Sequence, residues 1–142
     1  MPVNDLTVRI REFNNLIYYI RMSETAGNLK IRILEARLER DTSSFGSMDP
    51  YVVLETRMQR LRTATQKGAG KEPAWPNEEM AVDVKYIGDD LHVMIFDEKI
   101  ASDDIVGEVT LKLSALCANG GIDGWWEITY KGKKAGNIHL YS

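Results

Sequence analysis

The sequence predicts an all-β protein, an eight-stranded antiparallel β-sandwich with Greek-key connections. Apolar and polar residues alternate over short segments such as 29–33, 91–95 and 109–113, and alternation with a period of two marks a strand with one buried face. Turn-forming clusters separate these segments, for example the Asn-Gly-Gly at 119–121. A chain of 142 residues is long enough for one domain with its own core.

The strands follow one another at short, regular intervals, as is typical of a sandwich. We expect them near residues 29–36, 50–56, 60–65, 79–85, 90–96, 105–112, 125–130 and 136–141. A short helix is expected between the sixth and seventh strands, from Leu113 to Cys117.

The first 27 residues have a different pattern. Five apolar residues recur at intervals of four, three, four and three, a spacing that places them on one stripe of a helix: Leu6, Ile10, Phe13, Ile17 and Ile20. A hairpin that pairs residues 6–10 with 16–20 remains the alternative, because these segments are also rich in β-forming residues. We therefore expect an N-terminal extension over residues 1–27, with the helix favoured, before a domain over residues 28–142. The stripe must pack on that domain or on a partner protein.

Composition narrows the class of protein. The 18 basic and 21 acidic residues give a net charge of −3, which argues against nucleic-acid binding through bulk charge. Cys117 is the single cysteine, so an internal disulfide cannot form and a reducing compartment is expected. The sequence holds no apolar run of about 20 residues, and charged residues near its start argue against a signal peptide. We expect a cytoplasmic protein with peripheral membrane contact.

The sequence lacks the motifs of the common catalytic sites. Gly68–Lys71 resembles part of a phosphate-binding loop, but Thr65 and Glu72 stand where that motif requires Gly and Ser or Thr. His92 and His139 are isolated within expected strands. We therefore expect a protein that is not an enzyme.

Several segments, in order along the chain, resemble the C2 domain family. Residues 29–36 resemble its first strand, and 45–54 resemble its Gly-x-Ser-Asp-Pro-Tyr-Val motif, with Met48 where Ser is usual. Residues 60–63 are similar to its Lys-x-Lys-Thr segment, and 73–78 to its Pro-x-Trp-Asn-Glu motif with Pro76 inserted. Residues 91–107 resemble its aspartate loop and the next strand, and 124–140 its two closing strands. The resemblance covers residues 28–142 and implies a module that docks on anionic phospholipid membranes, commonly with calcium.

The resemblance also implies a calcium site, in a depleted form. Ser43 and Lys99 stand where the family has carboxylates, and the remaining candidates for metal ligands are Asp41, Asp49, Asp97, Asp103 and Asp104. Calcium affinity depends on the number of negatively charged oxygen ligands, and an ammonium among them opposes binding. We therefore expect weak or absent calcium binding. In the alternative interpretation, Asp49 caps a turn and Asp97 ends a strand.

Two further groups of residues are candidates for lipid binding. The family's Lys-x-Lys segment binds inositol-lipid headgroups, and the corresponding basic residues here are Arg60, Arg62, Lys67 and Lys71. Arg60 and Arg62 are two apart on a strand and so share one face. Phe45 and Ile100 lie near expected loop tips and could insert into a bilayer. Alternatively, the basic residues form a solvated strand face, and Phe45 and Ile100 pack under neighbouring loops.

The sequence thus predicts a non-enzymatic module for peripheral docking on anionic phospholipid, with weak or absent calcium dependence and no certain cofactor. The alternative is a protein-interaction subunit of a larger assembly, docking through the N-terminal segment and the sandwich surface. The depleted set of aspartates and the apolar stripe in residues 1–27 favour that alternative, whereas Arg60 and Arg62 favour the membrane.

Overall fold

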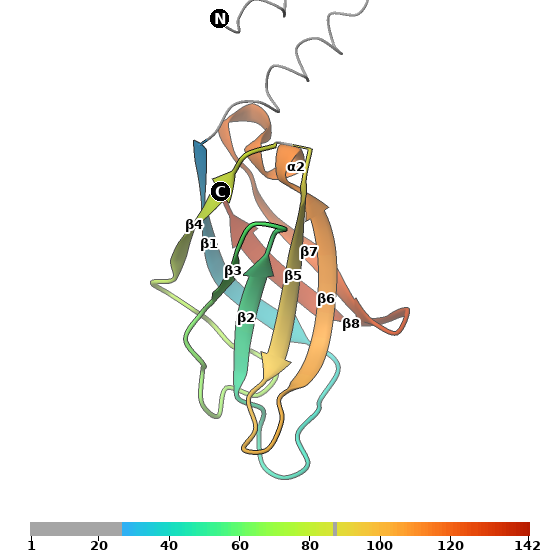
Figure 1. Ribbon diagram of the computed structural model, residues 1–142. Coiled ribbons are helices and arrows are strands. Elements are labelled where there is room, and N and C mark those ends of the chain that lie inside the picture. Colours follow the sequence, from blue (N-terminus) through green and yellow to red (C-terminus); the bar gives the residue numbers. More distant parts are fainter. Residues whose placement is uncertain (1–26, 87) are drawn as a thin grey trace, which may run out of the picture.

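The computed structural model describes residues 27–86 and 88–142 (Figure 1). The helix or hairpin expected within residues 5–22, with its apolar stripe, lies outside the described residues.

Eight strands and one short helix make up the described part of the chain, as the sequence predicts. The strands are β1 (Gly27–Leu38), β2 (Pro50–Glu55), β3 (Arg60–Arg62), β4 (Glu79–Val84), β5 (Asp90–Asp97), β6 (Asp104–Lys112), β7 (Asp123–Tyr130) and β8 (Lys133–Tyr141). The helix α2 (Leu113–Cys117) and the 3₁₀ turn η2 (Ala118–Gly120) connect β6 to β7. Every predicted strand is present, and the boundaries differ by a few residues at most.

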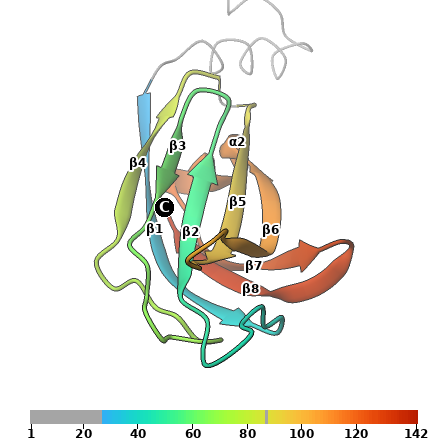
Figure 2. The ribbon, with the colours of Figure 1, turned by 60° about the horizontal axis from the view of Figure 1, so that its bottom comes forward.

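The strands form a sandwich of two layers (Figures 1 and 2). Their order is β3-β2-β5-β6-β7-β8-β1-β4, and all neighbouring strands are antiparallel. The first four strands form one layer and the last four form the other. One residue pair, Glu108 with Thr129, links β6 to β7 and so joins the layers at that edge. The prediction of an all-β antiparallel sandwich is confirmed.

Alternation along the strands sorts side chains between the core and the outer faces. In β2, Val52 and Leu54 enter the main core, whereas Tyr51 and Val53 face outward. The largest fully buried side chain is that of Trp75, whose indole N–H donates to the carbonyl of Ala64 at 3.0 Å. A second, smaller apolar cluster covers the outer face of β2 and β5, where the Tyr51 and Phe96 rings stack with centroids 5.5 Å apart.

Two strands differ in length from the prediction, each for a local reason. The sequence predicts β3 over residues 60–65, but it ends at Arg62 because the Thr63 side chain joins the pairing. The Thr63 hydroxyl accepts the N–H of Val52 at 2.9 Å and donates to the Ala64 carbonyl at 2.8 Å. The sequence predicts β8 from residue 136, but pairing starts at once after a two-residue turn, with Tyr130 opposite Lys133.

The start of β1 and the end of β8 lie at one end of the sandwich, and the loops 39–49, 63–78 and 98–103 lie at the other (Figure 1). Within the described residues, no helix is both long enough and apolar enough to cross a bilayer.

Candidate functional site

Three loops meet at the end of the sandwich opposite the start of β1. The N–H of Glu98 donates to the Asp49 carbonyl at 2.9 Å, and the N–H of Gly70 donates to the Met48 carbonyl at 3.0 Å. The N–H of Gly68 donates to the Asp49 carboxylate at 2.6 Å. The loops enclose a cavity of about 380 Å³ lined by Ser43, Ser44, Phe45, Ser47, Asp49, Lys67, Asp97, Glu98, Lys99 and Ile100.

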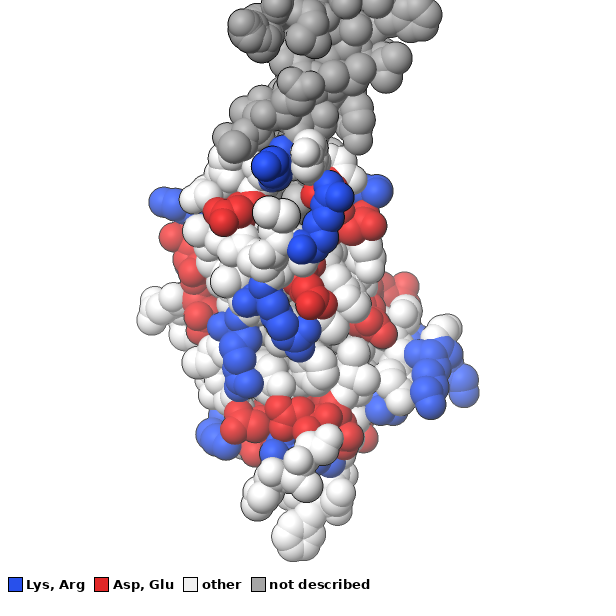
Figure 3. Space-filling model, viewed as in Figure 1, with Lys and Arg blue, Asp and Glu red and all other residues white. Residues whose placement is uncertain are grey.

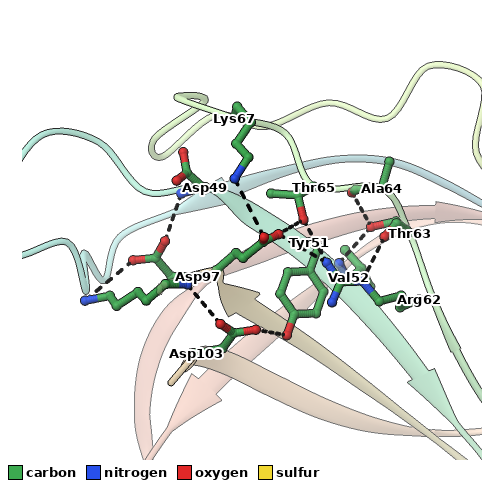
Figure 4. A network of polar contacts seen from close by, with 12 residues as sticks. Asp49, Tyr51, Val52, Arg62, Thr63, Ala64, Thr65, Lys67, Asp97 and Asp103 are labelled. Carbon is green, nitrogen blue, oxygen red and sulfur yellow. Dashed lines mark hydrogen bonds and ion pairs between the residues drawn. The ribbon is translucent and has the colours of Figure 1, made fainter. Parts of the chain in front are cut away.

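Asp97 ends β5 and is the buried acidic side chain of this site, with 2% of its surface exposed. One carboxylate oxygen accepts the N–H of Asp49 at 2.8 Å, and the other accepts the hydroxyl of Thr42 at 3.0 Å (Figure 4). Buried charges persist in proteins when hydrogen bonds and an opposite charge compensate them. Asp97 therefore ties β5 to the two sides of the 39–49 loop.

The ammonium of Lys99 lies among the acidic residues. It is 3.0 Å from an Asp104 carboxylate oxygen and 3.9 Å from Asp97, and it donates to the backbone carbonyl of Thr42 at 2.5 Å. The Lys99 backbone N–H also donates to the Asp103 carboxylate at 2.9 Å. A cation carried by the chain itself thus compensates the carboxylates of this loop.

Asp103 faces Tyr51 rather than the other aspartates. The Tyr51 hydroxyl donates to the Asp103 carboxylate at 2.5 Å (Figure 4). The hydrogen bonds from the Lys99 N–H and from Tyr51 lower the pKa of Asp103. Burial, with the Asp103 hydrogen bond and charge, raises the pKa of Tyr51 to about 12. The pair is therefore held as a neutral phenol donating to a carboxylate.

The predicted calcium ligands do not converge on one point. Asp97 and Asp104 face Lys99, while Asp49 accepts the N–H of Gly68. Asp103 accepts from Tyr51, and Asp41 bonds the N–H and hydroxyl of Ser43, which lower its pKa. Among residues 27–86 and 88–142, no three His, Cys, Asp or Glu side chains are grouped so as to hold a metal ion. Because calcium needs several converging oxygen ligands, this donor set does not fit the ion.

The predicted basic residues fall into two groups. Arg60 and Arg62 share the outer face of β3, as predicted, opposite Glu55 and Val53. Arg60 pairs with Glu55 at 3.2 Å, and the Arg62 guanidinium carbon lies 3.5 Å from the Tyr51 ring centroid.

Lys67 joins this group through Glu98, and Lys71 does not. Arg62 and Lys67 both pair with Glu98, at 3.3 and 3.6 Å. A hydrogen bond from the Thr65 hydroxyl and these two cations lower the pKa of Glu98. The Lys71 carbonyl instead accepts the N–H of Leu38, which places that residue beside the end of β1.

The predicted apolar loop tips are exposed. Phe45 is 90% exposed, Ile100 is fully exposed, and both line the cavity between the loops. They therefore do not pack under neighbouring loops, which was the alternative for these residues.

The sequence did not single out Thr42, Tyr51 or Glu98 as functional residues, although each makes two or more polar contacts in the site. Tyr51 could have been found, because its alternation with Val52 places it on the outer face below the arginines. Thr42 and Glu98 lie in loops, where periodicity gives no signal.

Comparisons with known proteins agree with this architecture. The family model for the C2 domain matches residues 27–128. Elicitor-responsive protein 3 of Oryza sativa subsp. japonica is 32% identical over 97 residues, which are 68% of this chain and 67% of that protein. Extended synaptotagmin-1 of Rattus norvegicus is 31% identical over 123 residues, which cover 82% of this chain but 11% of that protein.

Solved structures with the same fold include one pair of domains in two states. The tandem C2 domains of extended synaptotagmin 2 match with a TM-score of 0.69 and 26% identity, covering 81% of this chain and 39% of that one. Their calcium-bound structure matches with a TM-score of 0.69 and 25% identity, covering 81% of this chain and 44% of that one. The family match, the relatives and the sandwich itself lead to one conclusion: the chain belongs to the C2 domain family, whose members bind membranes or other proteins.

Proposed function

We propose that this C2 domain docks on anionic phospholipid membranes without calcium, through the tips of its loops and the arginines of β3. The observation that carries the proposal is the position of the Lys99 ammonium, 3.0 Å from Asp104 and 3.9 Å from Asp97. In the related proteins that use calcium, a dissolved ion neutralises the loop carboxylates. Here a side chain of the same loop neutralises two of them permanently, so the loops are arranged without a ligand.

Membrane contact would then come from apolar insertion. Phe45 and Ile100 project from two neighbouring loops, and full burial of such a side chain contributes about 1.5–3 kcal/mol. The guanidinium groups of Arg60 and Arg62 are about half exposed and pair with surface carboxylates. Such surface ion pairs are worth about 0–1 kcal/mol, so a lipid phosphate can replace the glutamate as partner.

Vesicle sedimentation tests the apolar part of this proposal. Changing Phe45→Ser together with Ile100→Ser removes both loop tips, and we expect binding to vesicles of phosphatidylcholine and phosphatidylserine to fall by about 100-fold, since two apolar insertions are lost. Met58→Ser is the matched control, because Met58 is 60% exposed in the turn between β2 and β3, at the opposite end of the sandwich. Equal loss in both variants, or none in either, would contradict insertion of these loops.

Calcium should leave both binding and stability unchanged. We expect no rise in melting temperature at about 100 μM calcium, because a ligand far below its dissociation constant stabilises negligibly. Lys99→Asp replaces the ammonium with a carboxylate beside Asp97 and Asp104, and this variant should gain a calcium-dependent rise in melting temperature. A calcium-dependent shift in the unmodified chain would overturn the role assigned to Lys99.

A protein-binding role is the second candidate, and one observation favours it. On the outer face of β7, Trp125 is 40% exposed and lies between Arg37 and His139, each 4.7 Å from its ring centroid. Exposed Trp and Arg are enriched at the energetic centres of protein interfaces. Absence of vesicle binding, combined with loss of a protein partner in Trp125→Ala, would favour this role over the membrane.

A further inference from the structure

The turn between β7 and β8 projects sideways from the sandwich in two different views (Figures 1 and 2). It carries Lys131, Lys133 and Lys134, and a separate basic group stands out at the same edge of the molecular surface (Figure 3). All three lysines are exposed. Sequence reasoning singled out other cations and did not include these.

The charges of the turn are less compensated than those of β3. The ammonium of Lys131 lies 5.3 Å from the centroid of the Tyr130 ring, and Lys134 pairs with Glu39 at 3.3 Å. Within the described parts of the chain, neither Lys131 nor Lys133 has an acidic side chain within ion-pair distance. Arg60, Arg62 and Lys67, by contrast, each pair with a glutamate.

The turn is fixed to the root of the loop that carries Phe45. The backbone N–H groups of Glu39 and Arg40 donate to the Ala135 carbonyl at 2.7 and 3.1 Å. The guanidinium of Arg40 lies 3.6 Å from the Tyr130 ring centroid and donates to the Ile105 carbonyl at 3.4 Å. The lysines therefore keep a constant position relative to the base of the 39–49 loop.

The backbone of the turn disfavours lysine. Lys131 has a φ of 50° and Gly132 a φ of 80°, and Tyr130 pairs with Lys133 across them. Positive φ at both central residues is the requirement of a type I′ turn, in which Asn, Asp or Gly is preferred at the first position. A lysine there is conformationally unfavourable, which is consistent with selection for its charge rather than for its fit to the turn.

The loop end of the sandwich needs such charges if it is to approach an anionic surface. The loops 39–49, 63–78 and 98–103 carry more acidic than basic residues, and an acidic band crosses this end of the molecule (Figure 3). An anionic bilayer repels that band, whereas the uncompensated lysines of the turn are attracted to it.

We propose that the Lys131–Lys134 turn is a second membrane contact, which binds the anionic surface of a phospholipid bilayer and holds the domain tilted so that the acidic band turns away from the lipid. This inference rests on the membrane docking proposed above. The turn supplies attraction to headgroups, while Phe45 and Ile100 supply insertion.

Sedimentation of the full chain with two kinds of vesicle tests this contact. The vesicles are phosphatidylcholine with phosphatidylserine, and phosphatidylcholine alone. Lys131→Asn combined with Lys133→Gln removes the two lysines that lack an acidic partner and keeps the Lys134–Glu39 pair. The control, Lys30→Gln combined with Lys85→Gln, makes the same change in net charge with exposed lysines of β1 and the residue after β4.

We expect the turn variant to bind the anionic vesicles about tenfold more weakly, with the control unchanged and with little difference on phosphatidylcholine alone. The turn variant should unfold at the same or a higher temperature, because Asn suits the positive φ at position 131. Equal weakening in both variants would overturn the proposal in favour of net charge. Unchanged binding in both would overturn it as well, and would leave the lysines to an acidic protein partner. Failure of the unmodified chain to bind anionic vesicles would overturn the proposed function itself.

Discussion

Replacing Asp97 by alanine is expected to destabilise the domain by about 3 kcal/mol. The carboxylate is buried and accepts hydrogen bonds from the Asp49 N–H and the Thr42 hydroxyl. Its removal leaves both donors without that acceptor, and Lys99 loses one of its two compensating carboxylates. Removing one partner of a buried charged network costs about 3–5 kcal/mol, and the partial exposure of Lys99 places this case at the lower limit. Equilibrium unfolding in urea measures the change.

Asp104→Ala is the matched control, because Asp104 also pairs with Lys99 but half of its side chain is exposed. An exposed ion pair is worth about 0–1 kcal/mol, so this variant should lose little stability. If the two variants lost equal stability, burial of Asp97 would not be what makes it important.

Replacing Trp75 by alanine should destabilise the domain by about 3–5 kcal/mol, the usual range for truncating a buried aromatic side chain. Trp75 is 1% exposed, and its indole N–H donates to the Ala64 carbonyl at 3.0 Å. Its backbone N–H donates to the Leu34 carbonyl at 2.8 Å, so the residue joins the 63–78 loop to β1. The change should also lower the melting temperature markedly, which differential scanning calorimetry measures.

Trp125→Ala is the control for this substitution. Trp125 is 40% exposed, and its contacts are surface stacking with His139 and Arg37. We expect a loss of about 1 kcal/mol, since exposed cation–π and stacking contacts are each worth about 0.5–1.5 kcal/mol. A loss as large as that of Trp75→Ala would contradict the assignment of Trp75 to the core and Trp125 to the surface.

The fold could be predicted from the sequence because each strand leaves a local pattern in the chain. The alternating apolar residues of β1, β5 and β6 give their inner faces directly, and turn residues give the limits. The end of β3 could not be predicted, since it depends on the Thr63 hydroxyl reaching the N–H of a residue on another strand. Contacts between residues far apart in sequence leave no periodic signal.

The candidate site could be predicted in part. Counting carboxylates and noting Lys99 was enough to expect a poor calcium site, because charge can be counted without coordinates. The orientation of the carboxylates could not be predicted. Asp103 and Asp104 are neighbours in the sequence, yet one faces Tyr51 and the other faces Lys99. The same limit applies to Arg62, whose stacking on Tyr51 depends on the register between β2 and β3.

The placement of β1 and β8 has a mechanical consequence. The two strands are antiparallel neighbours, with Arg32 opposite Tyr141, and the start of one lies at the same end as the finish of the other. A force that separates those two points loads the ladder at its last pair, and each backbone hydrogen bond contributes only about 0.5–1.5 kcal/mol. The pairs therefore open one after another, like a zip, rather than resisting together in shear. Tension applied across these points would peel β8 away at low force, whereas load applied through the loops would have to shear whole strands.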